Sequence, residues 1–252
     1  MIFKNLHNQN SPLLLGNVWD VQSALLFQKL GFKAIGTSSA AIATSLGYED
    51  GEKMPFDELL RIVKSIQSKI EIPLTVDIEG GYSRDIPEIV SNIILLHSLG
   101  VAGINIEDSK TNTEREILNA ENFSKTIQEV KSHLVENNTD IFINVRTDFY
   151  IMGLNNPLEE TLNRIKLYEK AGADGIFIPC IVQEDEIRRV VESTSLPINV
   201  MCMPTLPSFK DLESLGVKRI SMGNFLYNNS ISNIEKSINT IIDTQSFNSL
   251  FV

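Results

Sequence analysis

A short unit recurs along this chain and constrains its fold more than any other feature. In each copy a helix-like segment ends at a turn with glycine, and a short apolar run follows. The copies read LGFKAI from Leu30, LGVAGI from Leu99, AGADGI from Ala171 and LGVKRI from Leu215. Each glycine stands where a helix would end in a left-handed residue, a conformation that glycine adopts at little cost. Repeated helix-to-strand joins of this kind indicate parallel strands connected by helices.

Eight short, mostly apolar runs are predicted as strands that are buried on both faces. They are Leu13–Gly16, Ala34–Thr37, Leu74–Asp77, Gly103–Glu107, Ile141–Arg146, Gly175–Ile178, Ile198–Met201 and Arg219–Met222. Eight strand–helix units in about 250 residues match the size of a TIM (β/α)8 barrel. An open doubly wound sheet is the alternative, but that fold usually carries a GxGxxG or phosphate-binding loop after its first strand, and neither occurs here. No linker-like tract divides the chain, so we expect residues 1–252 to form a single barrel domain.

Charge and composition narrow the range of partners. The 252 residues carry a net charge of −10, which disfavours nucleic acid and offers no basic patch to anionic lipid. No apolar run approaches the roughly 20 residues of a membrane span. The first residues, MIFKNLHNQNSP, lack the apolar core of a signal peptide. We therefore expect a cytoplasmic protein with neither a nucleic-acid nor a membrane partner.

The stretch LTVDIEGGY, from Leu74 to Tyr82, carries the first candidate site. Asp77 and Glu79 are two residues apart, and in an extended segment such residues point to the same side. The two glycines that follow allow a sharp turn and leave room near both carboxylates. Oxygen ligands at this density suit Mg²⁺ or Mn²⁺. The alternative is an acidic loop that is simply solvated at the surface.

Polar residues follow several other predicted strands, and the chemistry of TIM barrels occurs at these carboxyl ends. Thr37 and Ser38 offer hydroxyls to a substrate oxyanion after the second strand, where Asp50 comes later in the loop. Glu107 ends the fourth strand and would join Asp77 and Glu79 around a cation. Arg146 ends the fifth strand and suits a bidentate contact to a carboxylate or phosphate. Each residue alone could be a cap or a loop residue, but the agreement of several strand ends favours one site.

Seven segments together resemble the isocitrate lyase and phosphoenolpyruvate mutase superfamily. They are GNVWDVQSA, GTSSAAIATSLGYEDGE, PLTVDIEGGY, GINIEDS, NVRTDF, AGADGIFIP and LGVKRISMG, in the superfamily's order. The resemblance implies a TIM-like barrel, often with its last helix exchanged between subunits of a dimer or tetramer. It also implies Mg²⁺, bound partly through water, and a 2-oxo carboxylate substrate or its enolate.

The same resemblance assigns roles to individual residues. The acids that match the superfamily's metal ligands are Asp77, Glu79 and Glu107. The substrate would be held by the metal, by the region of Thr37 and Ser38, and by Arg146. Asp50 matches an acid that lies near both metal and substrate, and we interpret it as orienting a metal-bound water or relaying a proton.

Residues 109–118 depart from the superfamily's pattern. Members that cleave isocitrate or methylisocitrate carry a KKCGH-like motif after the fourth strand, whereas this chain reads SKTNTEREI, without the proton-donating cysteine. The longer loop of the phosphonate-handling members is missing too. We therefore expect a Mg²⁺-dependent lyase or hydrolase that makes or breaks a C–C or C–P bond beside a 2-oxo carboxylate. Decarboxylation of an oxaloacetate-like diacid is the simplest such reaction, because it needs no cysteine acid. The alternative is a non-catalytic barrel that binds metal and a 2-oxo or 2-hydroxy acid.

The C-terminal segment predicts self-association. Apolar residues recur at helical spacing, and they are Ile231, Ile234, Ile238, Ile241 and Ile242, followed by Phe247, Leu250 and Phe251. We expect a homo-oligomer, a dimer or tetramer, that uses this stripe. The alternative is that the helix packs on its own barrel.

Overall fold

The computed structural model describes residues 2–111 and 113–251 and contains a closed barrel of eight parallel strands. The strands are β1 (Leu13–Val18), β2 (Ile35–Thr37), β3 (Leu74–Asp77), β4 (Gly103–Glu107), β7 (Phe142–Arg146), β8 (Gly175–Ile178), β9 (Ile198–Met201) and β10 (Arg219–Ser221). They pair in sequence order around the barrel, and β1 closes it by pairing with both β10 and β2. The predicted TIM barrel is confirmed, and each strand lies within two residues of its predicted bounds.

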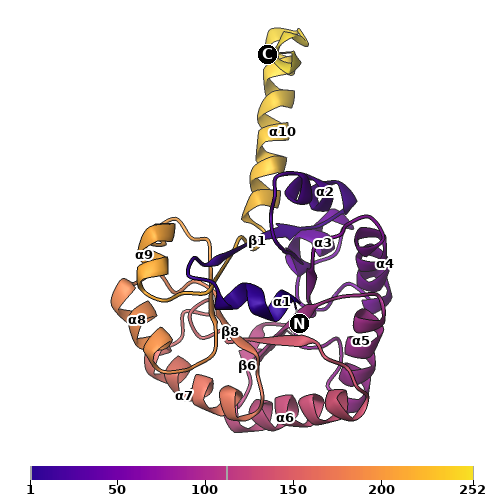
Figure 1. Cartoon of the computed structure of the whole chain (residues 1–252). Helices are drawn as coiled ribbons and strands as arrows, with labels where there is room; N and C mark the ends of the chain where they lie inside the picture. Colours follow the sequence, from indigo (N-terminus) through magenta and orange to yellow (C-terminus); the bar gives the residue numbers. More distant parts are fainter. Residues whose placement is uncertain (1, 112, 252) are drawn as a thin grey trace.

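A ring of helices surrounds the barrel (Figure 1). These are α2 (Val21–Lys29), α3 (Ser39–Ser45), α4 (Phe56–Gln67), α5 (Ile86–Ser98), α6 (Ala120–Glu136), α7 (Pro157–Lys170), α8 (Glu184–Glu192) and α9 (Phe209–Ser214). The glycines of the recurring unit behave as predicted, because Gly31, Gly100, Gly172 and Gly216 all have φ between 84° and 93°. Each lets a helix end and the chain re-enter the barrel as a strand.

Alternation along the strands gives the barrel a polar interior and an apolar outer layer. Outward residues such as Ile104 and Val145 pack in the main core between strands and helices. Inside the barrel, the Asn144 amide donates to Asn105 at 2.9 Å and to Asn199 at 3.2 Å. The Arg219 guanidinium lies in the same layer and donates to Asn105. Since residues two apart share a side, these same strands deliver polar groups to the carboxyl end above.

The first helix, α1 (Ile2–Asn5), and the following 3-10 turn η1 (Leu6–Asn8) cover the amino end of the barrel (Figure 1). Phe3 packs with Leu13 and Leu15 of β1 and with Phe142, the first residue of β7. The buried His7 ring stacks on Phe142 with 4.6 Å between ring centroids. This end is therefore sealed by apolar contacts, and access to the interior comes from the opposite end.

The last long helix, α10 (Phe225–Thr244), projects beyond the ring of helices, and the 3-10 turn η2 (Asn248–Leu250) follows it (Figure 1). None of the residues of α10 is buried. Ile234 and Ile242 are 55% and 58% exposed, so the apolar stripe does not pack on its own barrel. Within the described ranges, no helix combines the length and apolarity needed to cross a bilayer.

Candidate functional site

A cavity of about 150 Å³ opens at the carboxyl end of the barrel. Four of the predicted site residues line it: Ser38, Asp50, Asp77 and Arg146. They come from β3, from β7 and from the chain after β2, so residues distant in sequence meet as the barrel geometry predicts.

Arg146 is held in place by two buried carboxylates. Its Nε and Nη2 atoms donate to Asp148 at 2.6 and 3.2 Å, and its Nη1 lies 3.0 Å from Glu107 Oε2. Glu107 and Arg146 are direct neighbours across the β4–β7 pairing, which fixes this contact in register. The two bonds to Asp148 use two of the five N–H groups of the guanidinium, and its terminal nitrogens keep hydrogens for a ligand.

Asp148 is positioned in turn by a buried cluster behind it. Its backbone N–H donates to Asp108 Oδ1 at 2.9 Å. Asp108 Oδ2 accepts from Arg164 and from the Tyr168 hydroxyl, both at 2.8 Å. Burial alone would raise the pKa of Asp148, but the charge of Arg146 and the Ser109 hydrogen bond hold it below its ordinary value. Asp148 therefore stays ionised and keeps Arg146 oriented.

The sequence reasoning missed one arginine of this site. Directly after β4, β5 (Ser109–Thr111) pairs antiparallel with β6 (Arg115–Ile117) as a hairpin. Arg115 reaches from it into the cavity, where its Nη1 lies 3.0 Å from Glu107 Oε1 and 2.6 Å from Asp148 Oδ2. The signal was its place in a short segment after a barrel strand, where active-site loops occur.

The hydroxyls after β2 have structural partners of their own. Thr37 Oγ1 accepts the Asp77 N–H at 2.9 Å, which ties β2 to the end of β3. Ser38 Oγ accepts the Ala41 N–H at 3.3 Å and caps α3. Ser38 also lines the cavity, whereas Thr37 is not among its lining residues. Ser38 is therefore the better placed of the two to meet a substrate, and the role of Thr37 stays a prediction.

Glu79 departs from the expected extended geometry. β3 ends at Asp77, and Glu79 has a left-handed backbone with φ of 51°. Its Oε2 accepts the Glu52 N–H at 2.6 Å, and it lines a smaller hollow with Glu107 rather than the cavity that Asp77 lines. The two acids of the LTVDIEGGY stretch thus border different hollows.

Comparison with known proteins identifies the family. Residues 3–242 match the sequence profile of the family described as phosphoenolpyruvate phosphomutase. This chain belongs to that family. The match confirms the resemblance to the isocitrate lyase and phosphoenolpyruvate mutase superfamily, whose members are lyases and mutases that act on oxo acids.

Three relatives of this family member show the range of its similarities. An uncharacterized protein of Mycobacterium tuberculosis is 34% identical over 227 residues, 90% of this chain and 83% of the relative. Oxaloacetate decarboxylase 1 of Pseudomonas fluorescens is 26% identical over 86% of this chain and 75% of its own. A crystal structure of a provisionally assigned phosphonomutase from Burkholderia cenocepacia superposes with a TM-score of 0.88, at 32% identity and covering 94% and 98% of the two chains.

Family members of this kind use a divalent metal, and the acids of this chain suit one. Glu107 Oε2 is fully buried, and its contact within the part of the chain that the structure describes is the ion pair with Arg146 Nη1 at 3.0 Å, which lacks hydrogen-bond geometry. Burial, reinforced by the charges of Asp50, Asp77 and Glu107, raises the pKa of Glu79 to about 9. Burial also raises the pKa of Glu107, against the charge of Arg146. A divalent cation would relieve this crowding of negative charge.

The arrangement of the carboxylates suits Mg²⁺, which binds partly through water, better than a metal that needs a closed cage of protein ligands. Among residues 2–111 and 113–251, no group of three metal-ligating side chains is close enough to hold an ion alone. Mg²⁺ usually keeps several waters and takes only one or two carboxylates. The assignment of Asp77, Glu79 and Glu107 as ligands that act partly through water, which the resemblance implies, stays a prediction.

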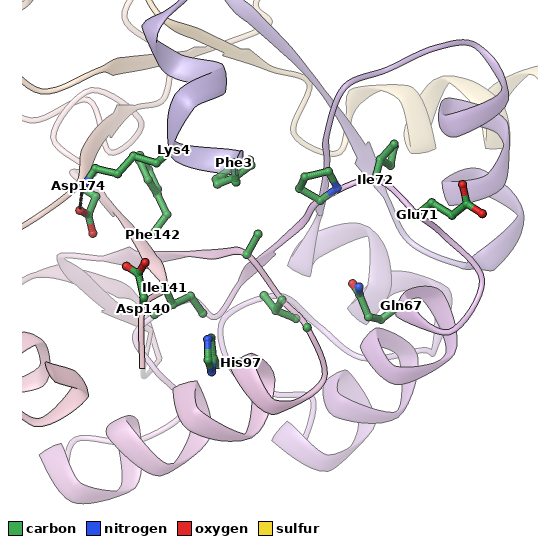
Figure 2. Close-up of a pocket in the computed structure, with 14 residues that line it drawn as sticks. Phe3, Lys4, Gln67, Glu71, Ile72, His97, Asp140, Ile141, Phe142 and Asp174 are labelled. Atoms are coloured by element: carbon green, nitrogen blue, oxygen red, sulfur yellow. Dashed lines mark hydrogen bonds and ion pairs between the residues drawn. The ribbon is translucent and has the colours of Figure 1, made fainter. Parts of the chain in front are cut away.

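A second cavity, of about 420 Å³, lies at the amino end of the barrel (Figure 2). Lys4 of α1 pairs there with Asp174 at 2.8 Å, and Phe3 and Phe142 form part of the wall. The cavity contains none of the carboxyl-end residues described above. The carboxyl-end cavity, in contrast, is lined by the predicted site residues Ser38, Asp50, Asp77 and Arg146.

Proposed function

We propose that this protein is a Mg²⁺-dependent lyase that breaks a C–C bond beside the carbonyl of a small 2-oxo carboxylate. Decarboxylation of an oxaloacetate-like diacid is the reaction we favour within the wider class of lyases and hydrolases that act on C–C or C–P bonds. The observation that carries the proposal is the carboxyl-end cavity, which brings the Arg146 guanidinium together with Asp77 and Ser38. The relative named oxaloacetate decarboxylase 1 supports the choice of reaction.

Arg146 is proposed to bind the carboxylate next to the carbonyl. Asp148 fixes its orientation through two hydrogen bonds, and the terminal nitrogens can form two parallel bonds to a carboxylate. A guanidinium held before substrate arrives loses little freedom on binding. The Ser38 hydroxyl faces the same cavity and can donate to a substrate oxygen.

We assign the acids of the site two roles, metal binding and proton transfer. Held by Asp77, Glu79 and Glu107, Mg²⁺ would act as a Lewis acid on the substrate carbonyl. Asp50 stands at the rim of the cavity, and its side chain is 43% exposed. Its carboxylate can relay a proton to the carbon from which CO2 departs, or it can orient a water that delivers this proton. We propose Asp50 for this role because decarboxylation needs one proton delivered to that carbon.

The second candidate is a non-catalytic barrel that binds metal and an oxo acid. It is favoured by the hairpin sequence, which has no cysteine where related lyases carry their proton donor. In this case Asp50 would only help to hold the ligand, and no bond would break.

Turnover of a panel of 2-oxo and 2-hydroxy diacids, with Mg²⁺ and again with EDTA, tests the proposal. We expect Mg²⁺-dependent turnover that Asp50→Asn lowers while leaving Mg²⁺ affinity largely unchanged. An Asp211→Asn variant purified in parallel is the matched control, because Asp211 is an exposed acid on α9. Tight binding of oxalate, an enolate mimic, with no turnover of any diacid would establish the binder instead.

A further inference from the structure

The β5–β6 hairpin brings a second guanidinium to the cavity that Arg146 lines. Arg115 Nη1 contacts Glu107 Oε1 at 3.0 Å, Asp148 Oδ2 at 2.6 Å and Ser109 Oγ at 3.3 Å. The Arg115 side chain is 23% exposed, whereas Glu107 and Asp148 are 3% and 0% exposed. Arg115 thus reaches from the hairpin to the buried floor and still borders the open space.

The two arginines share the same two carboxylates. Glu107 presents Oε1 to Arg115 and Oε2 to Arg146, while Asp148 presents Oδ1 to Arg146 and Oδ2 to both arginines. Two acids and two guanidiniums of this kind balance in charge, so the group can be buried without an isolated ion. The bridging also sets both guanidiniums side by side on one wall of one cavity.

Nη2 of Arg115, the terminal nitrogen that does not contact Glu107 or Asp148, is weakly bonded. Among the described residues, this Nη2 makes one contact, 3.5 Å from Asp50 Oδ2, at the upper limit for a hydrogen bond. Asp50 is at the rim and partly exposed, so this contact is weakened further by solvent. A ligand anion in the cavity could take the Nη2 hydrogens without disturbing the bonds of Nη1.

We propose that Arg115 binds the second anionic group of the substrate, the carboxylate farther from the carbonyl, and so selects dicarboxylates over monocarboxylates. This rests on the proposed function for the assignment of Arg146 to the carboxylate beside the carbonyl. Two anchors on one wall hold the two ends of a short diacid, and a monocarboxylate leaves the Arg115 anchor empty. Arg115 is then a specificity-determining residue supplied by a segment that departs from the superfamily's pattern.

Calorimetric binding of L-malate and L-lactate in Mg²⁺ tests this without any turnover. The two acids share a 2-hydroxy carboxylate and differ by one carboxylate group, and neither carries the oxo group that decarboxylation requires. We expect the parent to bind malate at least tenfold more tightly than lactate, which equals about 1.4 kcal/mol. Arg115→Gln should abolish that preference, leaving the dissociation constant of lactate within about twofold.

Two further variants separate recognition from structure. Lys110→Gln removes a positive charge from the same hairpin. Lys110 pairs with Glu116 and borders the smaller hollow of Glu79 and Glu107, not the carboxyl-end cavity, so any effect on Mg²⁺ should change both affinities alike and keep the malate preference. Arg115→Lys keeps the charge on a different donor and should recover part of the preference, which a variant with a disrupted hairpin would not do.

Several results would overturn the inference. These are equal affinity of the parent for the two acids, an equal loss for both in Arg115→Gln, or a preference that survives Arg115→Gln. Each would mean that Arg115 only neutralises Glu107 and Asp148. An Arg115-dependent malate preference in a protein that turns over no diacid would keep this inference and refute the proposed lyase. Failure of the parent to bind either acid would refute this inference, whereas the turnover panel decides the proposed lyase separately.

Discussion

The affinity of the site for Mg²⁺ should rise steeply with pH. Glu79 is buried beside Asp50, Asp77 and Glu107, and its pKa is raised to about 9. At pH 7 it carries a proton, which a metal that binds the carboxylate must displace. The affinity for Mg²⁺ is therefore reduced below pH 9, and it rises about tenfold for each pH unit up to that value. At pH 7 the loss is two units, about 2.7 kcal/mol or roughly a hundredfold in affinity.

Glu107 acts in the same direction because burial raises its pKa too. The slope of log affinity against pH therefore lies between one and two near neutral pH, according to how many protons leave. Calorimetry in HEPES and in Tris, whose ionisation enthalpies differ, counts the protons released. Glu79→Gln should lower the slope by one unit and weaken the affinity measured near pH 9.

A matched control is Glu58→Gln, since Glu58 pairs with Arg61 on the exposed face of α4. It should leave both the slope and the proton count unchanged. The reasoning fails if Mg²⁺ affinity stays constant between about pH 7 and pH 9 and no protons are released. That result would show that Glu79 is ionised before the metal binds, or that it is not a ligand.

Three further variants test other parts of the structure. Asp77→Asn should weaken Mg²⁺ binding at least tenfold, about 1.4 kcal/mol, without lowering the melting temperature, because it relieves like-charge repulsion; unchanged affinity would refute the ligand assignment. Arg146→Lys should lower kcat/KM for the preferred diacid by roughly 30-fold, about 2 kcal/mol, and an undiminished value would remove Arg146 from substrate binding. Burial and the charge of Arg219 lower the pKa of His7 to about 4, so the unfolded chain gains a proton below about pH 6.5 that the folded chain excludes. Unfolding free energy should thus fall by up to about 3 kcal/mol between pH 6.5 and 4, and urea titrations should show that this component is absent in His7→Gln.

The barrel could be predicted because its signal repeats. Apolar strands, and glycines with positive φ at helix ends, recur along the whole chain. An error in the predicted end of one strand therefore leaves the number of predicted strands unchanged. The convergence of Asp77, Glu107 and Arg146 was also predictable, because strand register alone places Glu107 opposite Arg146 and Asp77 opposite Asn105. These features depend on periodicity, which a sequence displays directly.

The rest of the site depends on backbone conformations that do not follow the periodicity of a helix or a strand. Glu79 adopts φ of 51°, so the rule that residues two apart share a side stops at Asp77. Arg115 reaches Glu107 and Asp148 only because a hairpin folds back over the strand end. Its strands are three residues each, too short for an alternating pattern to stand out from a loop. Sequence motifs show which residues a site shares with relatives, and they say little about a side chain that one chain supplies from a different segment.

The exposed stripe on α10 gives the final prediction, that the protein self-associates through this helix. Ile231, Ile234, Ile238 and Ile242 are each 48–58% exposed, and covering one such half-exposed side chain contributes roughly 1 kcal/mol. Across a symmetric interface the contribution counts twice, because each copy covers the other. Light scattering at micromolar concentration should give a multiple of the 28.2 kDa chain mass.

Replacing two residues of the stripe should separate the subunits while leaving the barrel folded. Ile234→Glu with Ile238→Glu places charge in the apolar contact, whereas Asn229→Glu with Lys236→Glu adds charge to the opposite face of the helix and should leave the assembly unchanged. Because no residue of α10 is buried, neither pair should alter the near-ultraviolet circular dichroism of the barrel. A parent protein that is monomeric at micromolar concentration would refute self-association. An oligomer that persists in the isoleucine variant would place its interface elsewhere on the barrel, since two buried charges on each copy cost far more than the stripe contributes.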